Sequence, residues 1–344
     1  MFGSQTAKEM EGFLADLHRQ LLSHGGSKKE KTISFEIVFV KRFVHFFLVC
    51  QKEVEDLVTG QIYAHFPGIE IEKTGNYIDN HAQEYSENFS LVACEIGMKN
   101  KDLYPIKTYF QLEKDSLVGL SGIFSKISRD ESIFIQLLLL PIKENTFQEV
   151  CRFLRRMIRV TIEPSGGYQA MEAKFDKLYF QGKIIICCSS PNPRLSRRRL
   201  SQVIKFFDGF DNDPLNGLEG RSVVVGKRAL DLYIRREMRG RNYFFNIEEV
   251  ASLYHFPGKT SPIANIIKVS SKKAEPPENL PQTQFFENEN ISTFGLTNFR
   301  NTFLPFGIKR IDRARHMYFL GKTGVGKSKL LELLMLLTSY SSVF

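Results

Sequence analysis

The chain has 344 residues, of which 42% are hydrophobic and 25% are charged. This composition excludes an intrinsically disordered or membrane-embedded chain, and the length is sufficient for two or three domains that each bury a core. The formal net charge of +9 is compatible with attraction to phosphate polyanions or to an anionic membrane surface. Charge alone does not select between these partners.

The cysteines and the hydropathy pattern indicate a cytoplasmic protein. The five cysteines have no CxxC spacing, and several lie in apolar runs such as Ile184–Cys188, as reduced core residues do. The sequence has no run of about 18 apolar residues and no secretory signal. We therefore expect a cytoplasmic location, with association at the inner face of the cell membrane as an option, and an anchor could precede Met1 in a longer parent.

Residues 1–31 are expected to form an amphipathic helix followed by a polar linker. The apolar side chains that share one face of this helix are Met10, Phe13, Leu14, Leu17 and Leu21.

Two α+β regions are expected to follow, over residues 32–145 and 146–268. Periodicity and turn residues separate strands from helices in both regions. The first region has predicted strands at 33–39, 43–50, 90–96 and 132–140, and predicted helices at 53–66 and 115–127. The second region has predicted helices at 146–159, 171–179 and 194–207, and a predicted strand at 183–188. Two ferredoxin-like halves would fit this order of elements.

The end of the second region is expected to be helical. A basic helix is expected from Ala229, and Asn246 and Glu249 have the spacing of an N-cap and its reciprocal partner, which predicts a short helix that ends at Tyr254. Residues 269–300 are rich in Pro, Lys and Glu, as linkers are. Residues 301–344 are expected to begin another domain.

The sequence GKTGVGKS at Gly321–Ser328 has the spacing G-x-x-x-x-G-K-[ST] of a phosphate-binding loop, the Walker A motif. The apolar stretch Met317–Leu320 precedes it as an expected buried strand, and Lys327–Leu337 follows it as an expected helix. A phosphate site requires this order of strand, loop and helix. We therefore predict the start of an incomplete P-loop NTPase α/β domain, truncated after its first strand, loop and helix.

Each residue type in this loop has a physical role. Glycine permits backbone conformations that point several N–H groups at one anion, and the following helix adds free N–H groups and partial positive charge. We expect Lys327 to be the catalytic residue that reaches the β- and γ-phosphates of ATP, and Ser328 to ligate Mg²⁺ through its hydroxyl. The predicted nucleotide-binding residues are Gly321, Lys322, Thr323, Gly324, Val325, Gly326, Lys327, Ser328 and Lys329.

Hydrolysis of ATP needs further residues. An acidic side chain at the end of another strand holds Mg²⁺, and another residue orients the attacking water. The sequence ends at Phe344, and neither residue can be assigned in it. We expect a fragment or truncated product that lacks the Walker B motif and hydrolyses ATP poorly or not at all alone.

The stretch LPFGIKRIDRARHMYFLGKTGVGKSKLLELLM resembles the start of the motor domain in type IV secretion coupling proteins and related conjugative DNA-transfer ATPases, in the superfamily of the FtsK and HerA pumps. In that family a basic DR-x-RH segment leads into the loop, and Asp312, Arg313, Arg315 and His316 stand in its places. Upstream, NIEEVASLYHFPG resembles the passage that such proteins carry before the motor, and less specific similarity, as in SFEIVF, covers most of the chain before about Asn246. Lys329 departs from the family, which usually has Thr or Ser beside the α-phosphate at this place.

The resemblance implies a hexameric motor that uses ATP to move DNA toward secretion-channel proteins at the inner face of a bacterial membrane. Two alternatives stay open. The chain could be a degenerate or truncated interaction or assembly module without ATPase activity. It could also derive from a secretion or pilus-assembly ATPase that acts on protein.

Two arginine clusters could form nucleic-acid or lipid-headgroup patches, or only solvated helix faces. Neither reading is favoured by the spacing alone. The clusters are Arg152, Arg155, Arg156 and Arg159, and Arg194, Arg197, Arg198 and Arg199. We expect structural roles for His255 and His316, because the histidines form no cluster with metal-ligand spacing.

Overall fold

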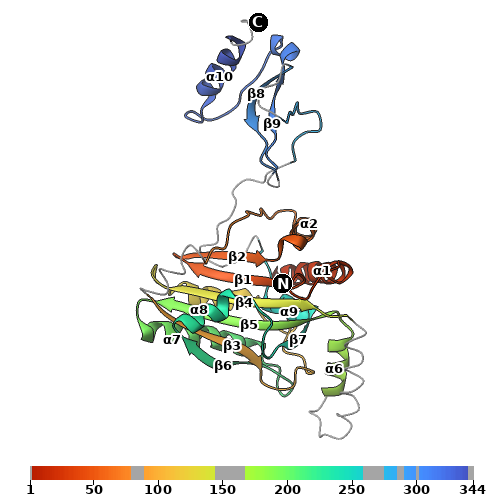
Figure 1. Cartoon of the computed structure of the whole chain (residues 1–344), viewed down its shortest axis with the longest axis vertical. Coiled ribbons are helices and arrows are strands. Elements are labelled where there is room, and N and C mark those ends of the chain that lie inside the picture. Colours follow the sequence, from red (N-terminus) through yellow and green to blue (C-terminus); the bar gives the residue numbers. More distant parts are fainter. Residues whose placement is uncertain are drawn as a thin grey trace. The chain divides into compact units, whose positions relative to one another are not determined.

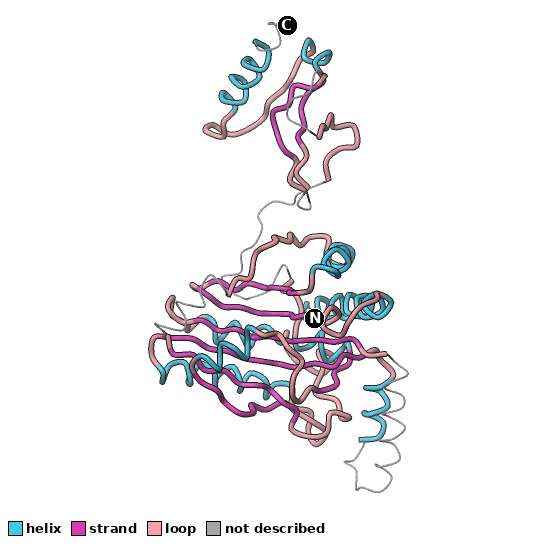
Figure 2. The backbone as a smooth tube through the Cα atoms, viewed as in Figure 1, coloured by secondary structure: helices cyan, strands magenta, loops and turns pink. Residues whose placement is uncertain are grey.

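The computed structural model of the chain describes residues 2–78, 89–143, 167–258, 275–284, 290–299 and 302–339. The chain divides into two compact units. The first consists of residues 1–69 and 74–268, and the second of residues 70–73 and 269–344. Figures 1 and 2 show the strands and helices of each unit.

An antiparallel sheet of seven strands forms the centre of the first unit (Figure 1). Its order is β2-β1-β4-β5-β3-β6, and β7 pairs with β5 outside this path. The strands are β1 (Ile33–Val40), β2 (Phe43–Val49), β3 (Ser90–Met98), β4 (Ser132–Pro141), β5 (Tyr179–Ser190), β6 (Leu218–Val225) and β7 (Tyr243–Asn246).

The strand order joins the two α+β regions that we expected over 32–145 and 146–268. Strand β5 comes from the second region, and it lies between β4 and β3, which both come from the first. The α+β class is therefore confirmed, but the strands form one sheet rather than two ferredoxin-like halves. Strands β6 and β7 were not expected from the sequence.

Helices pack on both faces of this sheet. Among its described residues, the first unit has the helices α1 (Phe2–Ser23), α2 (Glu55–His65), α4 (Ser116–Phe124), α6 (Gly167–Phe175), α7 (Pro193–Phe206), α8 (Lys227–Ile234) and α9 (Ile247–Leu253), with short 3₁₀ turns η1 (Lys52–Val54) and η2 (Phe207–Phe210). On one face, Phe39 of β1 stacks on Phe124 of α4, with ring centroids 5.0 Å apart. On the other face, Phe134 of β4 contacts Tyr233 of α8 at 5.5 Å.

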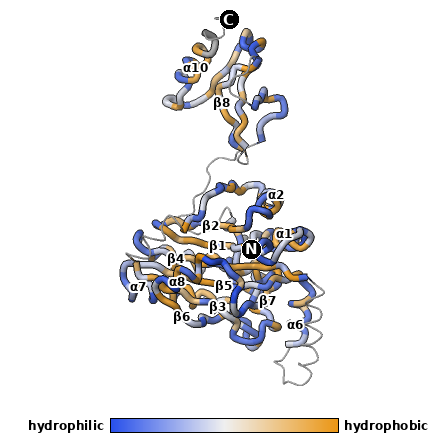
Figure 3. The backbone as a smooth tube through the Cα atoms, viewed as in Figure 1, coloured by the Kyte–Doolittle hydropathy of each residue, from blue (hydrophilic) through white to orange (hydrophobic). Residues whose placement is uncertain are grey.

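Coverage of both faces explains the composition of the central strands. Every residue of β4 is buried, and a strand buried on both faces is expected to be apolar throughout rather than alternating. The run SIFIQLLLL has one long polar side chain, Gln136, which donates hydrogen bonds to the Glu36 carboxylate and the Tyr233 carbonyl. Figure 3 shows that hydrophobic residues are concentrated along these strands.

The first helix is confirmed as amphipathic. The five apolar residues predicted to share a face are completely buried, and α1 packs against α9 and α2. The helix is long, but no helix among the residues that the structure describes is both long and apolar enough to cross a membrane.

The capping box that begins α9 is also confirmed. The backbone N–H of Glu249 donates to the Asn246 side chain at 2.8 Å, and the backbone N–H of Asn246 donates to the Glu249 carboxylate at 2.9 Å. The same carboxylate forms a buried ion pair with Lys174 of α6 at 3.1 Å. A local sequence motif therefore also anchors a distant helix.

The second unit contains a pair of antiparallel strands, β8 (Ile291–Leu296) and β9 (Pro305–Lys309), then the 3₁₀ turn η3 (Arg310–Ala314) and helix α10 (Lys327–Ser339). Strand β8 lies within residues 269–300, which we expected to be a linker. The two strands approach closely at Gly307, where an added Cβ would lie 2.1 Å from the Ser292 carbonyl oxygen. A side chain at this position would separate the strands.

Candidate functional site

The predicted phosphate-binding loop lies directly before α10. Gly324 has φ 86° and Gly326 has φ 91°, in the left-handed region that side chains with a Cβ rarely adopt. No heavy atom lies within 4 Å of a Cβ built at either glycine. The requirement for glycine therefore comes from the backbone conformation and not from crowding.

The side chain of Lys327 folds back across this loop. Its ammonium donates hydrogen bonds to the carbonyl oxygens of Gly321 at 2.6 Å and Lys322 at 2.8 Å. Lys327 is also the first residue of α10, so the ammonium lies on the loop side of the helix start, where unpaired backbone N–H groups add partial positive charge. This arrangement can attract an anion.

The other predicted loop residues are mostly exposed. Ser328 lies in the first turn of α10 and is exposed. Lys329 pairs with Glu332 on the helix surface at 2.7 Å, and Val325 has 62% of its surface exposed. A Cβ at Gly321 would lie 2.8 Å from a methyl group of Val325. The loop therefore closes on itself at this point while its outer residues contact solvent.

Arg313 connects the loop helix to the strands of the second unit. Its guanidinium donates to the Leu334 carbonyl of α10 at 2.5 Å and to the Ser292 hydroxyl of β8 at 3.1 Å. The Leu334 side chain is buried. Nearby, Arg315 forms an ion pair with Asp312 at 3.4 Å, whereas His316 is exposed. The basic segment before the loop thus contains one residue with a clear positioning role.

The expected strand at Met317–Leu320 is not present in the described part of the second unit. Tyr318 is 87% exposed and Leu320 is 85% exposed. A strand needs a neighbour that pairs with its N–H and C=O groups, and β8 and β9 pair with each other. The prediction of a strand at Met317–Leu320 was therefore wrong, because no described strand lies beside these residues to pair with them.

The loop residues fit a phosphate group. They combine a cation, a helix start and backbone turns that only glycine adopts readily, and each of these favours an anion. Among the described residues, no group of three or more His, Cys, Asp or Glu side chains is placed to hold a metal ion. The Ser328 hydroxyl remains the candidate Mg²⁺ ligand.

The second arginine cluster separates into buried and exposed residues on α7. Arg199 is buried and binds the Glu131 carboxylate, with Nε 2.6 Å from the carboxylate oxygen, whereas Arg194, Arg197 and Arg198 are exposed. The first cluster, at 152–159, and its predicted helix lie outside the described residues. The structure therefore gives a packing role to one arginine of the second cluster.

His255 has the structural role that we expected. The ring is buried and lies 3.0 Å from both the Ala251 carbonyl oxygen and the Asp115 carboxylate. Burial by itself would raise the pKa of Asp115, but hydrogen bonds from His255 and from the Leu117 N–H outweigh it and lower the pKa. This contact joins the start of α4 to the end of α9.

Cys94, Cys187 and Cys188 are buried free thiols. Burial raises the pKa of Cys187 to about 12, so the reactive thiolate is scarce at neutral pH. The expectation of reduced core cysteines holds for these three residues. Cys50 is half-buried, and Cys151 lies outside the described residues.

The first unit also contains a cavity rich in basic residues that was not expected from the sequence. Lys28 and Lys29 contribute to it from the turn before β1, and Arg235, Arg236 and Arg239 from the segment after α8. We call it the basic cavity. The run RREMRGR could have drawn attention to the second group, but only the fold brings the two lysines beside it.

Comparison of the sequence with protein-family models and with curated proteins found no match.

Proposed function

We propose that Gly321–Ser328 bind the phosphates of ATP together with Mg²⁺, as part of an ATP-driven motor that translocates DNA. The observation that carries the ATP proposal is the position of the Lys327 ammonium, which hydrogen bonds across its own loop to the Gly321 carbonyl. A cation held there, beside the start of a helix, lies where a phosphate group would bind.

Each part of the loop has a role in this proposal. Lys327 would exchange its bonds to the two carbonyl oxygens for bonds to the β- and γ-phosphates, and Ser328 would ligate Mg²⁺. The left-handed conformations of Gly324 and Gly326 would allow backbone N–H groups of the loop to point at the same anion. When bound, Mg²⁺ neutralises charge on the β- and γ-phosphates.

The DNA-transport part of the proposal rests on the resemblance to type IV secretion coupling proteins and conjugative ATPases. It includes a homo-hexamer, a location at the cytoplasmic face of the cell membrane and contacts with secretion-channel proteins. Arg313, a residue of the DR-x-RH segment, holds α10 against β8. That contact would couple the loop to the strands that precede it.

Nucleotide binding can be tested on the chain itself. Fluorescence anisotropy of a labelled ATP analogue with Mg²⁺ should give a saturable titration, and Lys327→Ala should weaken binding by about tenfold or more, since charge-assisted bonds to phosphate are lost. Lys309→Ala removes an exposed lysine of the same unit and should change the affinity by less than about twofold. Equal affinities of wild type and Lys327→Ala would refute the site.

DNA transport requires a second experiment, on the full-length protein. Its ATP turnover should rise on addition of DNA and should be lost with Lys327→Ala. Turnover stimulated by a secreted protein and not by DNA would instead favour the protein-secretion or pilus-assembly alternative. A full-length protein that binds no ATP would favour the interaction module.

A further inference from the structure

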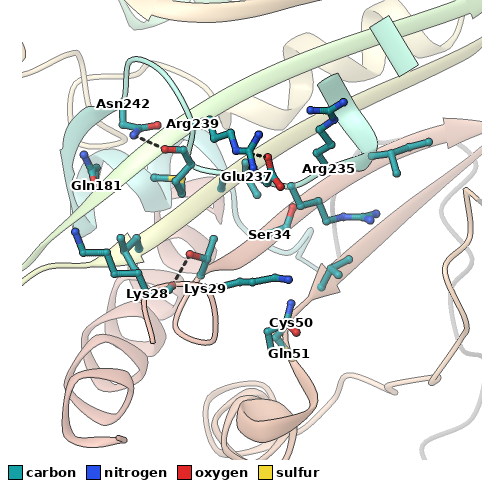
Figure 4. Close-up of a pocket in the computed structure, with 17 residues that line it drawn as sticks. Lys28, Lys29, Ser34, Cys50, Gln51, Gln181, Arg235, Glu237, Arg239 and Asn242 are labelled. Carbon is teal, nitrogen blue, oxygen red and sulfur yellow. Dashed lines mark hydrogen bonds and ion pairs between the residues drawn. The ribbon is translucent and has the colours of Figure 1, made fainter. Parts of the chain in front are cut away.

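The basic cavity of the first unit has the size of a small-molecule site. It has a volume of about 850 Å³, within the range of about 300–1,000 Å³ that is typical of ligand pockets. Its lining includes residues of the turn before β1, the end of β2 and the segment after α8. In Figure 4, Lys28 and Lys29 enter from one side, and Arg235 and Arg239 from the other.

The cavity has an excess of positive charge. Five cationic side chains line it, against one carboxylate, that of Glu237. Arg239 pairs with this carboxylate at 2.8 Å, and Arg236 pairs with the buried Glu36 at 2.7 Å. Within the described part of the chain, Lys28, Lys29 and Arg235 have no carboxylate partner. These three are therefore available to an anionic ligand.

A strained and firmly held backbone positions the arginines. Arg236 has φ 50°, which is uncommon for a residue with a side chain and is often associated with functional sites. Two N–H groups of its guanidinium bind Glu36, which is fully buried in β1. Three residues further on, the Lys183 ammonium donates to the Arg239 carbonyl at 2.7 Å.

The bonds between Arg236 and Glu36 and between Lys183 and the Arg239 carbonyl fix the two ends of the segment 236–239. Lys183 is held in turn by Glu95 at 2.6 Å. A segment fixed in this way loses little conformational entropy when a ligand binds. Neither attachment involves Arg235 or the lysines, so their side chains remain available.

Apolar side chains also line the cavity. Leu138 and Leu140 come from β4, and Ile234 and Met238 from the end of α8 and the segment that follows it. A cavity with cations on its sides and apolar residues in its lining suits a molecule with a charged phosphate end and an apolar or ring-containing part. An inorganic anion alone would leave this apolar surface unused.

We infer that the basic cavity is a binding site for a small organophosphate, with its phosphate on Lys28, Lys29 and Arg235 and its apolar part on Ile234 and Met238. This site lies wholly within the first unit. It is separate from the loop at Gly321–Ser328, and the inference does not depend on the ATP proposal.

The test measures phosphate binding with the loop inactivated. All proteins carry Lys327→Ala, so that residues 321–328 contribute little, and isothermal titration calorimetry measures the affinity for pyrophosphate. The site variant adds Lys28→Ala and Arg235→Ala. The matched control adds Arg197→Ala and Arg198→Ala instead, which removes two exposed positive charges from α7 of the same unit.

The site variant should bind pyrophosphate about tenfold or more weakly, and the control should lose less than about twofold. Equal losses in the two variants would overturn the inference, because they would indicate attraction to net charge alone. Circular dichroism of both variants should match that of the parent, since the substituted side chains are exposed.

Two further arms identify the source of the phosphate. The same variants are tested with a soluble nucleoside monophosphate and with vesicles that contain an anionic phospholipid. If only the site variant loses binding to the nucleoside monophosphate, the inference is supported and the phosphate belongs to a free metabolite. If only the site variant loses binding to the vesicles, the inference is supported and the phosphate belongs to a lipid headgroup. Binding of only long single-stranded DNA, lost equally in both variants, would overturn it.

Discussion

The Arg236 guanidinium binds the Glu36 carboxylate through two N–H groups, at 2.7 and 3.2 Å. Glu36 lies in the second strand from one end of the sheet and is fully buried. Its carboxylate also accepts hydrogen bonds from Tyr77 and Gln136. Burial and the adjacent carboxylate raise the pKa of Tyr77 above its ordinary value, so Tyr77 remains a donor at physiological pH.

This network predicts a large effect of removing one charge. Glu36→Gln keeps the size of the side chain but leaves the Arg236 guanidinium, whose side chain is only 15% exposed, without its anion, and should lower the free energy of unfolding by about 3 kcal/mol. Urea denaturation followed by circular dichroism measures the change. The double variant Glu36→Gln with Arg236→Met should recover much of the loss, because it removes the unpaired guanidinium, and the amide oxygen introduced at position 36 can still accept hydrogen bonds from Tyr77 and Gln136. A loss below about 0.5 kcal/mol in Glu36→Gln would contradict the role of the pair.

A second prediction concerns the acid sensitivity of the Glu131–Arg199 pair. Burial by itself would raise the pKa of Glu131, but hydrogen bonds from Arg199 and Ser128 outweigh it, and the pKa lies below the ordinary value of 4.5. A carboxylate whose pKa is lower in the folded state stabilises the fold above its unfolded pKa, and this contribution is lost as pH falls through the folded pKa.

Glu131→Gln should therefore destabilise the protein by about 1–3 kcal/mol at pH 7. The difference from wild type should decrease as pH falls below 4.5. Urea denaturation over a series of pH values measures both quantities. Glu113→Gln, at an exposed position, is the control and should have little effect at any pH. A difference that stays constant down to pH 3 would show that the charge of Glu131 does not contribute.

Local features of the fold could be predicted from the sequence. The capping box at Asn246 involves residues three positions apart, and the buried face of α1 repeats with the helical period, so both were visible in a short window. The residues that contact them from distant parts of the chain could not be predicted in this way. Glu249 pairs with Lys174, and nothing in the sequence around either residue indicates the other.

Strand β6 and the strand that we expected before the loop illustrate the same limit. Strand β6 has partly exposed residues and a weak alternation, because it lies at the edge of the sheet, and it was missed. Met317–Leu320 has the composition of a buried strand, but a strand forms only beside a partner. The loop itself was recognised because the positions of its glycines and lysine are fixed by local backbone geometry.

A third prediction concerns Arg313, which joins α10 to β8. Arg313→Ala removes the bonds to Leu334 and Ser292 and should destabilise the packing of α10 by about 2 kcal/mol. Hydrogen exchange of the α10 amides should become faster, and binding of the ATP analogue should weaken. Arg310→Ala, at an exposed position in the same 3₁₀ turn, should leave both unchanged. Unaltered exchange in Arg313→Ala would exclude the positioning role.

The last prediction separates backbone conformation from packing in the loop. Gly326 has φ 91° and open space where a Cβ would lie, so Gly326→Ala should introduce no clash but should disfavour the left-handed conformation by about 1–2 kcal/mol. The backbone N–H groups before α10 would then turn away from the phosphate. A cost of this size corresponds to a fall in affinity for the ATP analogue of about fivefold to thirtyfold.

Gly122→Ala is the matched control, because Gly122 also has open space but lies within α4, where alanine is favoured. The control should keep its affinity, measured by the same anisotropy titration. If Gly326→Ala binds ATP as tightly as wild type, the left-handed turn is not needed for the anion, and the nucleotide assignment of the loop loses its geometric basis.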